Sequence, residues 1–319
     1  MKKLYVVLMS ILLVGCNTSE KEVVTVVALK GPTAMGMVNF MDRVAKDEQF
    51  DNKYEFSIVT SPDEATAMLV KGEADIAALP ANLGATLYNN GGEIKATAIN
   101  TLGVLYILEN GNTINDIQDL KGKTIISAGK GATPEMSLRY ILAENGIDPD
   151  KDITIEWKSE QAEVLAYLVA NEGTIAMMPE PFVTTALQED ANITRSLDLT
   201  REWDKLQTDN SEKSALVTGI LVARDDFIED NSQALNEFLV NYEESVNFVN
   251  ADTAASAQLV SDYNIVPFET AIDAIPNCNI TFIEGNALEN NLSGYLEVLF
   301  NQNPNSIGGV LPDEAFYYR

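Results

Sequence analysis

The order of apolar and polar positions along the chain predicts alternating strands and helices. Residues 23–29 are apolar and β-branched, which is typical of a buried strand. Residues 37–45 carry apolar side chains at helical spacing, and residues 54–59 alternate as a strand does. A helix with proline in its first turn is predicted over residues 62–71, and another strand over residues 75–79. This order favours a mostly parallel sheet covered by helices.

The chain then repeats this pattern about one hundred residues later. Residues 64–86 align with residues 163–185 when Glu64 is placed on Glu163, and the apolar and proline positions coincide. Residues 123–136 repeat the strand, the glycine turn and the helix start. We therefore expect an α/β fold of two similar lobes with mainly parallel sheets. The general likeness of all strand-helix-strand units is the alternative explanation of the repeat.

Two chain crossings are expected between these lobes. Residues 23–102 and 217–319 would form lobe 1, and residues 103–216 would form lobe 2. The apolar run over residues 217–222 would cross back, and the mainly helical segment after it would pack onto lobe 1. Two crossings between two lobes make a hinge, as in a Venus flytrap.

The first residues have the pattern of an export signal. Lys2 and Lys3 precede an apolar run over residues 4–14, which is typical of a secretion signal and is too short to span a bilayer. The stretch Leu-Val-Gly-Cys that ends at Cys16 resembles the bacterial lipobox, which implies cleavage before Cys16 and a lipid on its sulfur. We expect a signal peptide over residues 1–15 and a lipidated tether over residues 16–22. An ordinary signal peptide with an accidental cysteine is the alternative.

The composition of the chain excludes several kinds of partner and of catalytic or metal site. The formal net charge of −27 argues against a nucleic-acid partner, because negative charge repels phosphates. The chain has no histidine and two cysteines, which excludes Ser-His-Asp and Cys-His catalysis, histidine-ligated metals and thiolate cages. No loop has the spacing of a calcium site. We expect no catalytic residue, no metal and no cofactor.

The turns that follow the predicted strands are the candidate binding elements, since ligands of open parallel sheets lie beyond the carboxyl ends of the strands. Gly31 would let the backbone turn closely, and Thr33 would cap a helix or turn its hydroxyl to a solute. The N–H groups of Ala34 and Met35 would be first-turn donors without a helical partner, which suits an anion. Thr33 acting only as a helix cap is the alternative.

Lobe 2 offers the same arrangement one repeat later. Lys130 and Gly131 form the turn, and Thr133 and Pro134 begin the helix. If the two lobes face one another, this turn meets the turn at Gly31 across a cleft. A cap role for Thr133 is again the alternative.

Further candidates follow the other strands. Asn82 carries donors and an acceptor, or is only a turn residue. Thr101 and Thr218 lie near the expected crossings and either contact the ligand or form the hinge.

Three larger side chains complete the set in lobe 2. Glu180 would bind an ammonium or a ring N–H, or would pair with Lys130 or Lys158 across the loops. Trp157 would stack on a planar ligand, and Phe182 is either an apolar wall or core.

The lipobox, the two lobes, the strand "ADIAALP" and the segment "MMPEPF" together resemble the substrate-binding lipoproteins of ABC importers. The chain is most similar to the nitrate, sulfonate, taurine and thiamine-precursor branch of type II periplasmic binding proteins. This resemblance implies a monomer that closes on a small solute and docks on a permease driven by an ATPase. It would be exported and held by lipid at the outer face of the bacterial membrane.

Two other functions fit the same fold. One is a sensing or adhesion lipoprotein without transport. The other is an enzyme related to pyrimidine-precursor synthases, which is disfavoured because that chemistry uses histidine and a cysteine cluster. The solute is expected to be small and polar, with aromatic or anionic character. Glu180 and Trp157 favour an aromatic or cationic group, whereas Gly31 and the helix starts favour an anionic one.

Overall fold

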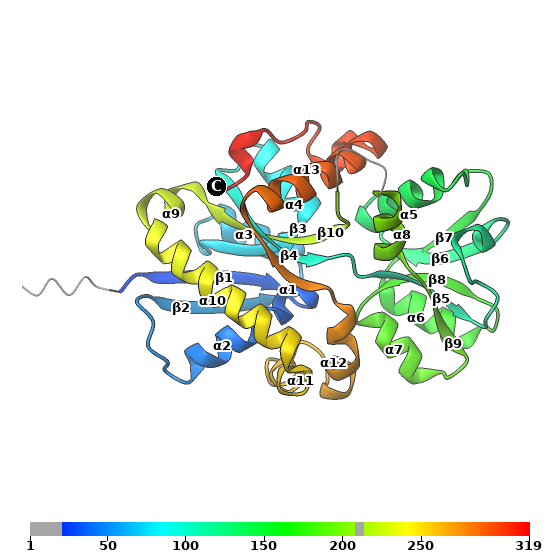
Figure 1. The fold of residues 1–319 in the computed structure, drawn as a ribbon, viewed down its shortest axis with the longest axis horizontal. Helices are drawn as coiled ribbons and strands as arrows, with labels where there is room; N and C mark the ends of the chain where they lie inside the picture. Colours follow the sequence, from blue (N-terminus) through cyan, green and yellow to red (C-terminus); the bar gives the residue numbers. More distant parts are fainter. Residues whose placement is uncertain (1–20, 208–213) are drawn as a thin grey trace, which may run out of the picture.

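The structure is a computed structural model that describes residues 21–207 and 214–319. The predicted signal peptide and the lipidated Cys16 lie outside the described residues. Figure 1 shows two α/β lobes side by side, each built on one sheet and covered by helices. Lobe 1 is named here for the part around the six-stranded sheet, and lobe 2 for the part around the five-stranded sheet.

The sheet of lobe 1 has the strand order β11-β4-β10-β3-β1-β2. Its strands are β1 Val23–Leu29, β2 Lys53–Val59, β3 Ile76–Pro80, β4 Ile94–Leu102, β10 Val217–Arg224 and β11 Ile280–Ile283. The helices of one face are α1 Pro32–Met35, α2 Val38–Ala45, α9 Asp225–Asp230, α10 Ser232–Ala251, α11 Thr253–Asp262 and α12 Phe268–Ala274. The helices of the other face are α3 Pro62–Val70, α4 Ala81–Asn89 and α13 Gly285–Gln302.

The sheet of lobe 2 has the order β7-β6-β8-β5-β9. Its strands are β5 Leu105–Asn110, β6 Thr124–Ala128, β7 Thr154–Lys158, β8 Ile175–Pro179 and β9 Ile193–Asp198. Its helices are α5 Thr133–Glu144 and α8 Leu199–Leu206 on one face, and α6 Gln161–Ala170 and α7 Phe182–Glu189 on the other. Short 3-10 turns are η1 Ile117–Leu120, η2 Ile275–Asn277, η3 Pro304–Ile307 and η4 Glu314–Phe316.

The prediction of two α/β lobes is confirmed, but the sheets are mixed rather than mainly parallel. The pairs β1–β2, β1–β3, β6–β7 and β6–β8 are parallel, whereas β5 and β10 run antiparallel to both of their neighbours. The reason lies in the crossings. β5 begins at Leu105, opposite Pro179, where β8 ends. A chain that enters a sheet from the other lobe starts at the edge where the parallel strands finish, so it must run against them.

The predicted division of the chain follows the sheets closely. Its first boundary falls between β4 and β5, and its second falls directly before β10. As a division into domains it stays a prediction. The C-terminal helices do pack onto lobe 1, but α12 and α13 also contact α7 and α5 of lobe 2. The C-terminal segment therefore links the lobes as well as completing lobe 1.

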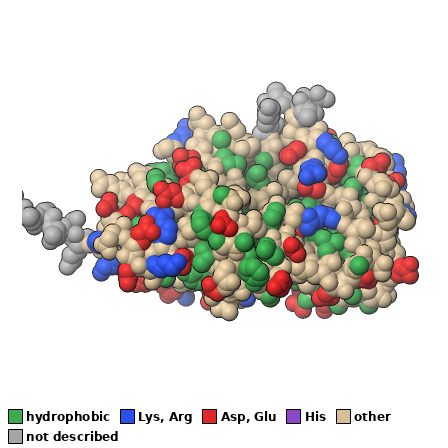
Figure 2. Space-filling model, turned by 60° about the horizontal axis from the view of Figure 1, so that its bottom comes forward, with side chains coloured by type: hydrophobic (Ala, Val, Ile, Leu, Met, Phe, Trp, Pro, Cys, Tyr) green, Lys and Arg blue, Asp and Glu red, His purple; other side chains and the backbone are tan. Residues whose placement is uncertain are grey.

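The surface carries a large acidic excess, with 48 Asp and Glu against 21 Lys and Arg. In Figure 2 acidic side chains are spread over the visible face with basic ones between them, and hydrophobic side chains gather across its middle. Arg43 shows how the basic groups are used, because it pairs with both Glu48 at 2.7 Å and Glu244 at 2.8 Å. Within residues 21–207 and 214–319, no helix has the length and apolar character needed to span a bilayer.

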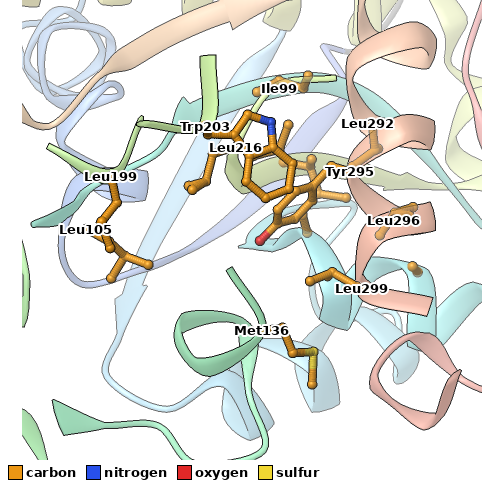
Figure 3. Close-up of a cluster of buried hydrophobic side chains, with 14 of the residues drawn as sticks. Ile99, Leu105, Met136, Leu199, Trp203, Leu216, Leu292, Tyr295, Leu296 and Leu299 are labelled. Atoms are coloured by element: carbon orange, nitrogen blue, oxygen red, sulfur yellow. The ribbon is translucent and has the colours of Figure 1, made fainter. Parts of the chain in front are cut away.

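An apolar seam joins the lobes on the side of α13. Trp203 of α8 is fully buried, and its ring centroid lies 5.5 Å from that of Tyr295 on α13. Figure 3 shows these two rings side by side among leucines of both lobes. The ring centroid of Tyr140 on α5 lies 4.5 Å from that of Trp203. The seam therefore places three aromatic rings where lobe 1 and lobe 2 meet.

On the opposite side of the molecule the contact between the lobes is polar. α12 contacts α7 there, as can be followed at the lower edge of Figure 1. The side-chain amide of Gln188 on α7 donates to the Glu269 carbonyl at 2.8 Å and to the Asp273 carboxylate at 3.0 Å, both on α12. The lobes are thus held together by an apolar seam on one side and by hydrogen bonds on the other.

Candidate functional site

The carboxyl ends of the parallel strands face the junction of the two lobes. In lobe 1, Pro80 at the end of β3 lies beside Gly219, and Gly219 lies beside Thr101 near the end of β4. In lobe 2, Pro179 at the end of β8 lies beside Leu105, the first residue after the crossing. The turns that the sequence singles out therefore lie between the lobes, where ligands of open α/β sheets bind.

The turn after β1 differs from the expected anion site. Gly31 has a φ of 129°, a conformation that residues with a side chain rarely adopt, so the position requires glycine. Its carbonyl accepts the N–H groups of Ala34 at 3.0 Å and Met35 at 3.1 Å, and both residues are fully buried. The expectation that these two donors are free is wrong, because α1 spans four residues and closes on its own turn. The Thr33 hydroxyl is also occupied, since it donates to the Leu29 carbonyl at 2.8 Å.

A cluster of buried polar atoms lies beside this turn. The side-chain amide of Asn100 and the hydroxyl of Thr101 are fully buried and have no hydrogen-bond partner among the described residues. A Cβ atom on Gly219 would lie 2.4 Å from the Asn100 Oδ1 atom and 2.8 Å from the Thr33 Cγ2 atom. The absence of a side chain at Gly219 is therefore what makes room for the amide. Buried polar groups without partners are rare, and each calls for an explanation such as a ligand or an ordered water.

A second group of hydroxyls comes from both lobes. Tyr295 on α13 of lobe 1 faces Ser137 and Thr133 on α5 of lobe 2, and burial raises the pKa of Tyr295 to about 12 while these two hydroxyls oppose the rise. The hydroxyls of Tyr295 and Ser137 are buried without a hydrogen bond of normal geometry among the described residues. The structure therefore brings the predicted Thr133 together with two side chains that the sequence analysis did not select.

The start of α5 differs in part from the expected binding turn. Thr133 is the first residue of the helix, and Pro134 follows it without an N–H group. Lys130 and Gly131 are exposed, and the Gly131 N–H donates to the Glu135 carboxylate at 2.7 Å. This carboxylate lies at the positive end of the α5 dipole and already satisfies part of it. Lys130 makes no ion pair with the described residues.

Glu180 is a structural group in this arrangement. Its side chain is fully buried, and its Oε1 atom lies 2.7 Å from Nη2 of Arg195. Its Oε2 atom accepts the N–H of Thr184 at 3.1 Å, near the start of α7. The expected pairing with Lys130 or Lys158 is wrong, since Arg195 on β9 takes the carboxylate instead. The carboxylate therefore already has a cationic partner within the protein.

Arg195 extends this pair into lobe 1. It donates to the Asn277 side-chain oxygen at 2.6 Å and lies over the ring of Tyr106, whose hydroxyl donates to the Asn277 carbonyl at 2.9 Å. A hollow of about 380 Å³ lies beside this junction and is lined by residues of both lobes. Cys278 follows Asn277, is fully buried, and has its thiol pKa raised by that burial, as expected of an inert thiol.

The remaining candidates are distributed around the junction. Asn82 donates to the Ser306 carbonyl at 3.4 Å, so its amide has a structural partner in the C-terminal segment. Phe182 packs partly against the core of lobe 2. Trp157 is half-buried on β7, which is an edge strand of its sheet. Thr218 is half-buried on β10, next to Gly219.

The sequence pattern did not indicate three of these residues, Asn100, Ser137 and Tyr295, and the reason differs for each. Asn100 lies inside a strand pattern, where a polar residue reads as solvent-facing. Ser137 follows the helix start by one turn, and its position on the same face as Thr133 was the available signal. Tyr295 lies more than 150 residues away on α13, and no local pattern connects it to α5. Among the described residues, no group of acidic or cysteine side chains could hold a metal ion.

Comparison with solved structures shows the fold. A protein described as an ABC transporter from Parabacteroides distasonis is 23% identical with a TM-score of 0.78, over 94% of this chain and 99% of that chain. The periplasmic aliphatic sulphonate binding protein of Escherichia coli is 15% identical with a TM-score of 0.74, over 94% and 93%. The periplasmic nitrate-binding protein of Synechocystis PCC 6803 is 18% identical with a TM-score of 0.57, over 84% and 75%.

Comparison of the sequence itself identifies the family. No curated protein matches the chain. A family model described as the phosphonate periplasmic substrate-binding protein of ABC transporters matches residues 38–274, which is well over half of the chain. The resemblance to ABC-importer binding proteins and the two-lobed fold are thereby confirmed. The chain belongs to the family of periplasmic substrate-binding proteins of ABC transporters.

Proposed function

We propose that this protein is the exported, lipid-anchored receptor of an ABC importer, and that it binds a small polar solute between its two lobes and delivers it to the permease. Membership of the family supplies the general role of a substrate-binding component. The solute, the site and the anchor are the parts proposed here.

One observation supports the position of the site most strongly. Asn100 and Thr101 on β4 of lobe 1 are buried without hydrogen-bond partners among the described residues. The hydroxyls of Ser137 on α5 and Tyr295 on α13 face each other across the lobes without a hydrogen bond of normal geometry. An unpaired buried polar group costs about 1–3 kcal/mol, so the two groups are best explained by a ligand that pairs with them. Thr133 completes this group from the sequence-predicted set.

The other predicted residues take supporting places. Gly31 and Gly131 provide the turns before α1 and α5, Pro134 lies in the first turn of α5, and Thr218 lies on β10 next to Gly219. Lys130 is exposed beside Gly131. Trp157, Asn82 and Phe182 are proposed as wall residues of the same cleft. Ala34, Met35 and Glu180 are left out of the proposed contacts, because their polar groups already have partners in the protein.

The first experiment is thermal unfolding of the full chain in mild detergent with a panel of solutes. The panel contains aliphatic sulfonates, phosphonates, nitrate, aromatic acids, amino acids and neutral amides. A ligand at a hundred times its dissociation constant stabilises the folded state by about 2.7 kcal/mol, which raises the melting temperature by several degrees.

Two variants decide whether such a shift comes from the junction. Thr133→Ala should weaken or abolish it. Thr253→Ala is the matched control, because Thr253 is likewise the first residue of a helix, α11, on the outer face of lobe 1. A shift that Thr133→Ala leaves unchanged would contradict the proposed site. A well-folded protein without any shift would favour a sensing or adhesion role.

The lipid anchor is tested separately. Wild-type protein expressed in a bacterium should fractionate with the membrane and should gain the mass of a lipid on Cys16. Cys16→Ser should be released into the soluble extracytoplasmic fraction with its solute binding intact. Membrane association of Cys16→Ser at the wild-type level would contradict lipid anchoring through this residue.

A further inference from the structure

We propose that the part of the site around Asn100 recognises a neutral group that both donates and accepts hydrogen bonds, such as a carboxamide or an imide, and not an oxyanion. This inference rests on the proposed function, since it concerns the solute of the same site. It separates this chain from the sulfonate and nitrate named for its structural neighbours.

The argument begins with the amide of Asn100. The residue is fully buried, and neither its Oδ1 nor its Nδ2 atom has a partner among the described residues. A primary amide presents two donor hydrogens and one acceptor oxygen, whichever way the group is turned. A ligand that satisfies this group must therefore accept at one atom and donate at a neighbouring atom.

The surroundings of the amide do not supply these partners. The Oδ1 atom lies beside Gly219, where a Cβ atom would also meet the methyl carbon of Thr33. The Thr33 hydroxyl is turned to the Leu29 carbonyl. The hydroxyl of Thr101 is unpaired as well, and it can donate or accept. Three groups are thus available to a ligand: the Asn100 oxygen as an acceptor, the Asn100 NH₂ group as a donor, and the Thr101 hydroxyl as either.

An oxyanion fits this set poorly. Nitrate and sulfonate only accept hydrogen bonds, so the Asn100 oxygen would stay unpaired and would face a negative charge. The side chains that meet at Gly219, namely Asn100, Thr33 and Thr101, are neutral, so none of them balances a buried charge. The lysines that follow β1 and β6, Lys30 and Lys130, are exposed. They suit an anionic part of a solute at the edge of the site better than one at the amide.

The first arm of the test compares two buried asparagines without any ligand. Asn110 is 3% exposed, and its amide donates to the Leu168 carbonyl at 2.9 Å. Asn110→Leu should therefore lower the melting temperature. Asn100→Leu should raise it or leave it unchanged, because leucine replaces a polar group that has no partner. A fall like that of Asn110→Leu would show that a buried water or the protein already satisfies Asn100, and would overturn the proposal.

The second arm uses matched probes on the full chain. Nicotinamide, benzamide and succinimide are compared with nicotinate, benzoate, methylphosphonate, methanesulfonate and nitrate. We expect stabilisation by one or more neutral probes and at least a tenfold loss of affinity in Asn100→Leu. Thr101→Val provides an independent variant with the same expected pattern, should Asn100→Leu fold poorly.

The outcomes of this arm also separate the two proposals. Binding of the oxyanions alone, lost in Thr133→Ala but kept in Asn100→Leu, would overturn this inference and leave the proposed function standing. Absence of a shift with every neutral probe would overturn it too. Binding of a neutral probe that Thr133→Ala and Asn100→Leu both leave unchanged would count against both proposals.

Discussion

At the scale of single residues, the pair of Glu180 and Arg195 is the clearest electrostatic feature. The Glu180 side chain is fully buried, whereas the Arg195 side chain keeps 26% of its exposure. Burial raises the pKa of Glu180, while its bonds to Thr184 and the charge of Arg195 oppose the rise. Because the folded protein holds this proton more tightly than the unfolded chain, the contribution of Glu180 to stability is largest at low pH. It is lost as the pH rises through the folded pKa.

This asymmetry predicts unequal effects of the two partners. Arg195→Leu leaves a buried carboxylate without a counter-charge and should lower the free energy of unfolding by about 3–5 kcal/mol at pH 7. Glu180→Gln should cost less, because Arg195 retains solvent, Asn277 and the ring of Tyr106. Mild acidification should restore part of the stability of Arg195→Leu by protonating Glu180.

Urea unfolding of the two variants and the double variant, at pH 7 and pH 5.5, measures these differences. The double variant should be more stable than Arg195→Leu alone, since it lacks the buried charge. Equal and pH-independent losses in Arg195→Leu and Glu180→Gln would contradict this view of the pair.

The position of a residue could be predicted where its type and its place after a strand were sufficient, whereas its role in binding stays a prediction. Thr101 and Thr133 were selected in this way, and both lie at the junction of the lobes. The partner of Glu180 could not be predicted, because Arg195 becomes its neighbour only through the order β8-β5-β9. Asn100 was missed because burial without a partner is a property of the folded chain and leaves no local pattern.

At the scale of elements, the strands were predictable and their directions were not. The apolar runs of β1, β3, β6 and β8 are parallel strands joined by helices, as the pattern indicated. The runs of β5 and β10 have the same apolar character, but these strands are antiparallel to their neighbours β8 and β3. An apolar β-branched run indicates burial, and its direction depends on the edge of the sheet at which the chain arrives.

The helix after Gly31 shows how a single tertiary contact alters an element. The pattern predicted one helix from the turn onward, but the structure has α1 and α2 separated at Gly36 and Met37. A Cβ atom on Gly36 would lie 2.7 Å from the hydroxyl of Tyr242 on α10. The helix pair therefore accommodates a tyrosine more than 200 residues away, which no local pattern could reveal.

At the scale of the whole molecule, the proposed function requires two lobes that part and close around a solute. The described structure has the lobes in contact on both sides, through the seam of Trp203 and Tyr295 and through the bonds of Gln188 to α12. A solute that contacts both lobes shifts the population toward this closed form, by no more than its difference in affinity for the two forms. The repeat in the sequence predicted the two lobes, whereas the seam depends on α13 and could not be predicted from it.

The central claim is tested most directly by the fluorescence of Trp203. The chain has two tryptophans, so Trp157→Phe leaves Trp203 as the single reporter of the seam. The described structure buries Trp203 fully beside Tyr295, whereas a form with the lobes apart would separate the two rings. If the lobes close on a saturating solute identified by thermal unfolding, the emission of Trp203 should move to shorter wavelength and its quenching by acrylamide should fall. Unchanged emission and quenching at saturation would contradict closure of the lobes on the solute.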